Sequence, residues 1–207
     1  MYNQPAFIET DLSSLHEFMH AARLVNIITT TNAGLMATPI PMLLAPQEGP
    51  FGTLYGHVAR ANTQWSTPPL ADALALFMGP DAYISPSWYA SKQEHHKVVP
   101  TWNYVTVHAY GPVEFFEDEA RLHDLVSRLT DHHEQGRAEP WAVADAPKTF
   151  IDGMLKAIVG VRLPITRLEG KRKMSQNRPE KDRQGVATNL AQSPLASDQD
   201  VAKLISL

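Results

Sequence analysis

Cysteine is missing entirely from this chain of 207 residues. Without it there is no disulfide, no thiolate metal site and no cysteine nucleophile. A cysteine-free composition fits a reducing compartment, and we expect the protein in the cytoplasm. No apolar run approaches the roughly 20 residues that a membrane-spanning helix requires. Residues 1–5 also lack the basic and apolar regions of a signal peptide, so we expect no membrane association.

An excess of positive charge is missing as well. The formal net charge is −4 and the isoelectric point is about 6.1. Domains that bind nucleic acid mainly through electrostatic attraction are usually basic, so this charge balance counts against such a function. The most basic run, residues 170–178, is followed at once by alternating acidic and basic residues over 180–183. That run suits either a solvated surface or a local contact to phosphate or nucleic acid, and both interpretations stay open.

Several catalytic motifs are absent too. The chain has no P-loop, no G-x-G-x-x-G dinucleotide fingerprint and no G-x-S-x-G elbow. Residues 16–20 do match the H-E-x-x-H motif of zinc hydrolases. They lie on an expected helix whose apolar side carries Leu12, Leu15 and Met19, and no third ligand stands out. The chain also has two pairs of adjacent histidines, His95-His96 and His132-His133. The side chains of neighbouring residues point apart in a helix or a strand, so neither pair can chelate a metal by itself and we predict no metal site.

What the sequence does contain is a series of short apolar segments separated by turn residues. This pattern predicts a mainly β, α+β fold, a barrel or sandwich rather than a parallel sheet. We expect one domain over residues 1–190 and a polar, mobile tail over 191–207. A turn is expected at Gly79-Pro80-Asp81. The expected strands are 25–31, 35–44, 52–58, 73–78, 102–110, 113–116 and 160–168, and the expected helices are 11–22, 117–131 and 149–159.

Residues 54–65 combine a strand-like pattern with polar residues at every second position. Arg60, Asn62 and Gln64 follow the apolar half of this stretch. If the strand continues, the guanidinium and two amides point the same way, as binding a phosphate requires. A solvated strand end is the alternative. Thr38-Pro39-Ile40-Pro41 lacks two ladder donors, which predicts an edge strand whose backbone is available to a ligand.

Trp102 stands between two polar residues, Thr101 and Asn103, where a strand is expected to begin. An indole in this position could cover a planar ligand, with the flanking side chains hydrogen-bonding ring heteroatoms. A core tryptophan with a satisfied N–H is an equally good interpretation.

Five separated segments together carry a resemblance to a known family. Taken in order over about residues 1–190, they resemble the PaiB-type FMN-binding split-barrel proteins, which are described as negative transcriptional regulators. One departure is Thr63, where the family pattern has proline. The segments are ATPIP (37–41), YGHVARAN (55–62), YISPSWY (83–89), VPTWNY (99–104) and KMSQNR (173–178).

The resemblance implies a six-stranded split β-barrel with peripheral helices, a homodimer, and FMN at the dimer interface. By this resemblance Arg60 and Asn62 hold the FMN phosphate. The backbone of Thr38, Pro39 and Ile40 faces the isoalloxazine. The remaining residues implied to bind the cofactor lie beside or around the ring: His57, Lys92, Thr101, Trp102, Asn103, Ser175 and Gln176.

Two other functions remain open on the same fold, and the sequence does not decide whether the protein is an enzyme. One is a flavin-dependent oxidoreductase or a haem-degrading enzyme, with His57 or Tyr89 as proton donor. The other is a repressor that binds DNA directly through residues 171–173 of both subunits. The absence of a helix-turn-helix pattern and the acidic net charge count against direct DNA binding.

Overall fold

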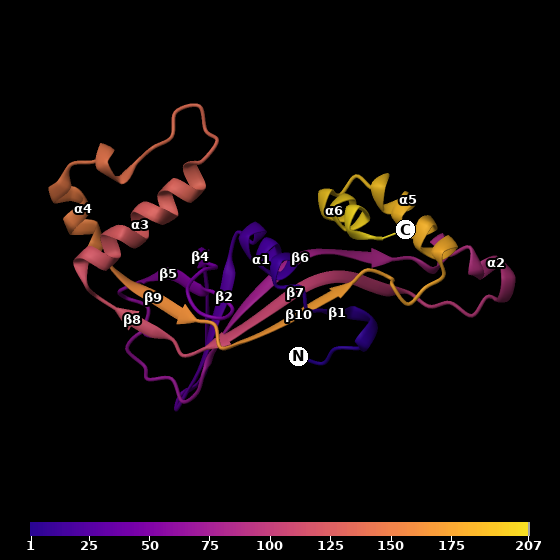
Figure 1. The fold of residues 1–207 in the computed structure, drawn as a ribbon, viewed down its shortest axis with the longest axis horizontal. Coiled ribbons are helices and arrows are strands. Elements are labelled where there is room, and N and C mark those ends of the chain that lie inside the picture. The colour runs from indigo at the N-terminus through magenta and orange to yellow at the C-terminus, as the bar shows by residue number, and fades with distance from the viewer. Residues whose placement is uncertain (207) are drawn as a thin grey trace. The chain divides into compact units, whose positions relative to one another are not determined.

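The structure is a computed structural model and describes residues 1–206. It divides into two compact units. Unit 1 comprises Met1–Ala21, Met78–Val107 and Glu169–Leu207, and unit 2 comprises Ala22–Phe77 and His108–Leu168. Three strands, β6 (Ala73–Ile84), β7 (Thr101–Gly111) and β10 (Arg167–Lys173), have residues in both units (Figure 1).

In unit 2, β2 (Val25–Thr31) and β3 (Gly34–Ile40) form the hairpin that the sequence predicts. Alternate residues of β2 are buried, which is the period of a strand with one face in the core. Gly34 adopts a φ of 109° at the turn, a conformation that favours glycine. β2 also pairs antiparallel with the first part of β6. β3 has no second neighbour in the described sheet, so the prediction of an edge strand is confirmed.

The second sheet of unit 2 has the order β4-β5-β9-β8. Its strands are β4 (Met42–Ala45), β5 (Thr53–Ala59), β9 (Ile158–Pro164) and β8 (Glu114–Phe116). Helices α3 (Glu119–Glu134) and α4 (Lys148–Leu155) pack on one face of this sheet through Leu122, Leu125, Leu129 and Leu155. Phe116 belongs to the same cluster and lies against Gly160, where a Cβ would come within 2.3 Å of its ring. Unit 2 also contains the short helix η3 (Val143–Asp145).

In unit 1 the short strand β1 (Ile8–Glu9) begins the strand order β1-β10-β7-β6. Helices α5 (Glu180–Ala191) and α6 (Ala196–Leu204) pack together (Figure 1). They cover a core cluster that includes Tyr89, Met174, Leu190 and Val201. The elements that belong to this unit alone are η1 (Pro5–Phe7), β1 (Ile8–Glu9), α1 (Leu12–Ala21), η2 (Pro86–Trp88), α2 (Ser91–His95), α5 (Glu180–Ala191) and α6 (Ala196–Leu204).

Several local predictions are wrong. The strand predicted over 35–44 is two strands, because Pro41 has no N–H to continue the ladder and separates β3 from β4. Gly79-Pro80-Asp81 does not form a turn but lies inside β6. The helix predicted over 149–159 ends at Leu155, and β9 begins at Ile158.

The segment after Gln192 is also different from the predicted mobile tail. It forms α6, in which Val201 is fully buried, and Ile205 follows one helical turn later with 7% exposure. Both side chains belong to the core cluster of unit 1. A few apolar residues at helical spacing therefore anchor a segment whose composition is mostly polar.

We expect Val201→Ala to lower the free energy of unfolding by about 1–2 kcal/mol, since two buried methyl groups are lost and a small cavity remains. Urea unfolding followed by circular dichroism measures this. Leu195→Ala is the control, because Leu195 is 61% exposed and should change stability by less than about 0.5 kcal/mol. Equal effects of the two substitutions would show that α6 does not pack as described.

Candidate functional site

The predicted site residues fall into two groups, one in each unit. The group in unit 2 comes from β3, β5 and the turn after β5, and that in unit 1 comes from α2, β7 and the segment after β10. The unit 2 group is Thr38, Pro39, Ile40, His57, Arg60 and Asn62, and the unit 1 group is Lys92, Thr101, Trp102, Asn103, Ser175 and Gln176.

The unit 2 group is organised by a buried amide. Gln64 is fully buried, and its Nε2 donates to Ile27 O at 3.2 Å, Thr29 Oγ1 at 3.0 Å and Met36 O at 3.3 Å. Its Oε1 accepts a hydrogen bond from Thr38 Oγ1 at 2.6 Å. Gln64 therefore ties the turn after β5 to the β2–β3 hairpin and does not present its amide to a ligand.

The geometry that the alternate spacing predicts for this stretch is consequently wrong. β5 ends at Ala59, and Asn62 N donates to Ala59 O at 2.9 Å in a turn. Asn62 instead donates from Nδ2 to Thr38 Oγ1 at 2.9 Å and accepts at Oδ1 from Gln64 N at 2.9 Å. The structure thus brings Thr38 and Asn62 together through the turn.

Arg60 is held at the end of β5 by backbone acceptors. Its Nε donates to Lys156 O at 2.6 Å and its Nη2 to Ile158 O at 3.4 Å. Its Nη1 forms an ion pair with Glu117. The side chains of Arg60 and Glu117 are 39% and 53% exposed. The guanidinium is therefore fixed in direction but reachable from solvent, and its outer edge is paired with a surface carboxylate.

The other members of the unit 2 group differ in accessibility. Pro39 is exposed on the edge strand, and Ile40 is buried with 5% exposure. His57 is half-buried on β5, and its Nδ1 has no hydrogen-bond partner among the described residues. Burial lowers the pKa of His57 below its usual 6.5, which favours the neutral imidazole.

In unit 1 the structure gathers Thr101, Asn103 and Ser175 around a pocket of about 110 Å³. Asn103 and Ser175 are both buried, and Asn103 Nδ2 donates to Ser175 Oγ at 3.0 Å. Ser175 has a φ of 63°, an uncommon conformation for a residue with a side chain and one that often marks functional sites.

Three other predicted residues of unit 1 do not line this pocket. Lys92 donates to Ser87 Oγ at 3.3 Å on the surface. Gln176 folds back on its own segment, where its Oε1 accepts from Met174 N at 2.6 Å. Trp102 is 53% exposed and stacks edge to face with Tyr83 at 5.9 Å between ring centroids. The exposure of Trp102 makes the core interpretation of this residue wrong.

The sequence does not assign the charged and phenolic members of the pocket to cofactor binding: it suggests Tyr89 only as the proton donor of an enzyme and Lys173 only as a DNA contact. Lys173 donates to Thr101 Oγ1 and Trp102 O, and Arg178 lies 4.7 Å from the centroid of the Tyr89 ring. Burial, with help from Lys171 and Arg178, lowers the pKa of Lys173. The segment 173–178 contains both cations, but only the pocket that they line together with Tyr89 identifies them as one site.

The donor set of this pocket is suited to an anionic or carbonyl-rich group. Lys173 and Arg178 bring two cations, and no carboxylate lines the pocket. The hydroxyl of Tyr89 is buried and makes no hydrogen bond of good geometry within residues 1–206, although the Arg178 guanidinium is close to it, and burial raises the pKa of Tyr89. A buried polar atom without a partner requires an explanation, and a ligand that accepts its proton supplies one.

The described residues contain no group of three His, Asp or Glu side chains arranged to hold a metal ion. The histidines of the H-E-x-x-H match lie on α1, whose Leu15 and Met19 are buried. Among residues 1–206, no helix has both the length and the apolar character needed to cross a bilayer.

Comparison with known proteins gives matches along most of the chain. A family model described as "Putative FMN-binding domain" matches residues 1–167. "Protease synthase and sporulation protein PAI 2" of Bacillus subtilis is 30% identical over 206 residues, covering 99% of this chain and 96% of that protein. An uncharacterised protein of Aspergillus fumigatus is 32% identical over 252 residues, with 99% and 96% coverage.

Solved structures resemble this chain in fold. The flavocytochrome Anf3 from Azotobacter vinelandii superposes with a TM-score of 0.59 and 16% identity, covering 85% of this chain and 74% of that one. The FAD and haem binding protein from Mycobacterium smegmatis gives a TM-score of 0.57 and 16% identity, with 80% and 73% coverage. These likenesses confirm the predicted split-barrel fold.

The lowered pKa of His57 makes a prediction about acid stability. The His57 imidazole takes up a proton more readily in the unfolded chain than in the folded one. The folded state is therefore favoured above pH 6.5, and this contribution to the free energy of unfolding is lost as the pH falls below that value. We expect His57→Gln to reduce the fall in melting temperature between about pH 7 and pH 5. His123→Gln, at an exposed position of α3, is the control and should leave the fall unchanged. Identical profiles for wild type and both variants would contradict this role of His57.

Proposed function

The chain belongs to this family of FMN-binding domains, and from that premise we propose that its flavin is FMN, bound by the two groups of residues described above. The observation that carries the proposal is the unit 1 pocket with Lys173, Arg178 and the unpartnered Tyr89 hydroxyl. The protein would supply binding and electrostatics, and a bound flavin would supply the redox chemistry.

We assign the pyrimidine edge of the isoalloxazine to the unit 1 pocket. That edge carries carbonyl oxygens and gains negative charge on reduction, so it suits two cations together with hydroxyl and amide donors. Thr101, Asn103 and Ser175 would donate to it. Trp102 has the exposed aromatic face that could lie beside the ring, and Lys92 and Gln176 would close the site from its margin.

We assign the phosphate to Arg60 and Asn62 in unit 2. The Arg60 guanidinium is already oriented by two carbonyls, and its outer edge contacts Glu117. A phosphate monoester carries more charge than a carboxylate and matches the arginine fork, so it can replace Glu117. The backbone of Thr38, Pro39 and Ile40 would face the ring from the edge strand, with His57 as a further neighbour.

We also propose a homodimer in the cytoplasm that acts in regulation, as its relative PAI 2 is named for sporulation. The edge strand and the exposed Tyr83–Trp102 pair offer surfaces for a second copy. Sedimentation velocity tests the dimer, and a monomer at micromolar concentration would contradict it. A gel-shift assay at low salt tests direct DNA contact through the basic residues 171–173.

A flavin-dependent oxidoreductase is the second candidate, and Tyr89 is the observation in its favour. A buried phenol beside Arg178, in a pocket that Lys173 also lines, is a suitable proton donor for a reaction at the flavin. Oxidation of a nicotinamide cofactor with turnover of an acceptor would support catalysis, provided that Tyr89→Phe reduces the rate but retains flavin.

Arg60→Ala is expected to weaken FMN binding at least about tenfold, since a charge-assisted hydrogen bond contributes about 1.5–3 kcal/mol. Riboflavin has no phosphate, so its affinity should not change. Quenching of flavin fluorescence measures both constants. Glu117→Gln should have the opposite effect on FMN, tightening it several-fold, because the competing carboxylate is gone.

Arg137→Ala is the matched control, because it removes an exposed cation elsewhere in unit 2. Equal losses of FMN and riboflavin in Arg60→Ala would show that Arg60 does not bind the phosphate. If the purified protein carries no flavin and does not quench the fluorescence of added flavin, the proposal that it binds FMN is contradicted.

A further inference from the structure

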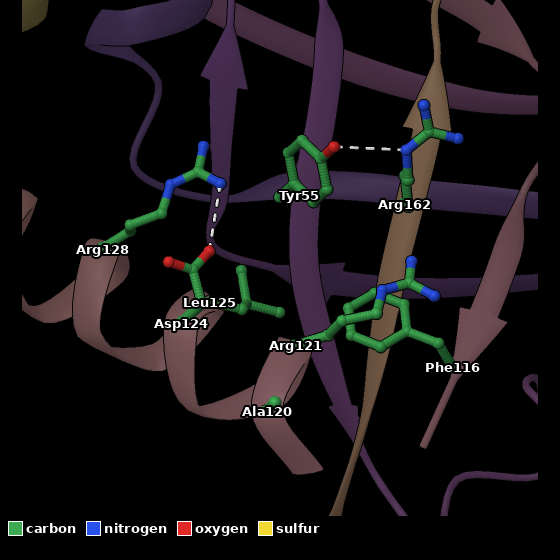
Figure 2. A pocket seen from close by; sticks show the side chains of 8 residues that line it. All are labelled: Tyr55, Phe116, Ala120, Arg121, Asp124, Leu125, Arg128 and Arg162. Atoms are coloured by element: carbon green, nitrogen blue, oxygen red, sulfur yellow. Dashed lines mark hydrogen bonds and ion pairs between the residues drawn. The ribbon is translucent and has the colours of Figure 1, made fainter. Parts of the chain in front are cut away.

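A second, larger pocket lies in unit 2, between α3 and the sheet face that this helix covers. Its volume is about 460 Å³, within the range of small-molecule sites. Figure 2 shows Arg121, Asp124 and Arg128 reaching it from α3, and Tyr55 and Arg162 from strands β5 and β9. None of these residues belongs to the proposed flavin site.

Aromatic rings hold the guanidiniums of this pocket in place. Arg121 lies over the Phe116 ring, 3.8 Å from its centroid, and Arg128 lies 5.0 Å from the centroid of Tyr55 (Figure 2). Arg162 Nε donates to the Tyr55 hydroxyl at 3.2 Å. Stacking orients a guanidinium without neutralising it, so the cations keep their charge for a ligand.

Two of the three carboxylates that accompany these arginines, Glu114 and Glu48, do not line the pocket. Glu114 accepts from Arg121 Nη1 at 2.7 Å and lies 3.6 Å from Arg162 Nη1. The hydrogen bond from Arg121 is the main reason why the pKa of Glu114 is lowered. Glu48 accepts from the Tyr55 hydroxyl. Asp124 is the one carboxylate in the lining, 3.4 Å from Arg128. Each guanidinium has five N–H donors, more than these contacts use, so donors are left for a ligand.

We propose that this pocket binds the phosphate group of a small molecule at a site separate from the flavin. Three guanidiniums approach it from two elements, α3 and β9. A carboxylate satisfies a single arginine fork, whereas a phosphate has oxygens for more than one. The rings of Tyr55 and Phe116 give the rest of the molecule an apolar surface to contact.

Isothermal titration with inorganic pyrophosphate at low ionic strength tests the proposal, first on the protein as purified and then on protein saturated with FMN. We expect binding in both, with Arg128→Gln weakening it about tenfold. Asp124→Asn should tighten it several-fold, a gain that a misfolded variant would not produce. Arg137→Gln is the matched control, since it removes the same charge from a 63% exposed side chain outside the pocket.

Four results would overturn the proposal. The first is that pyrophosphate does not bind at millimolar concentration. The second is that citrate binds and pyrophosphate does not. The third is that Arg128→Gln and Arg137→Gln weaken the binding of pyrophosphate equally, which would indicate nonspecific charge attraction. The fourth result is that FMN displaces pyrophosphate and that the affinity for FMN falls in Arg128→Gln. This result would show that the pocket binds the phosphate of the flavin. The first titration needs no flavin, so failure of the flavin assignment leaves this test intact.

Discussion

The buried side-chain amide of Gln64 is the interaction on which the unit 2 site depends. Its hydrogen bonds to β2 and to β3, including Thr38, satisfy the amide inside the core. An unpaired polar group there would lower the stability of the fold by about 1–3 kcal/mol. The turn after β5 is thereby tied to the hairpin. That connection sets Asn62 against the Thr38 hydroxyl and leaves Arg60 at the surface with its direction fixed.

Cations held beside aromatic rings recur in both units. Arg178 lies beside Tyr89 in the small pocket of unit 1, and Arg121 lies over Phe116 in the larger pocket of unit 2. A ring restrains the position of a cation and, unlike a carboxylate, leaves its charge available. Where a carboxylate also pairs with the cation, as Glu117 does with Arg60 and Glu114 with Arg121, an anionic ligand has to compete with that carboxylate.

Much of the fold follows from local sequence pattern. β2, β5 and β7 lie within about one residue of their predicted bounds, because the alternation of apolar residues acts over short distances. The errors come where tertiary context overrides a local signal. β6 runs through Gly79-Pro80-Asp81, and α6 forms in a polar segment because Val201 and Ile205 find a core to enter.

By itself the sequence determined the strand pattern, the family and most of the residues proposed to meet the flavin, since these depend on residue order and short spacings. Only the tertiary structure decided what those residues contact. It buried Gln64, paired Arg60 with Glu117, and brought Lys173 to Thr101. It also gathered the arginines of α3 and β9 into one pocket. The physical reason is that these contacts join side chains from distant parts of the chain, and no local period records which of them will meet.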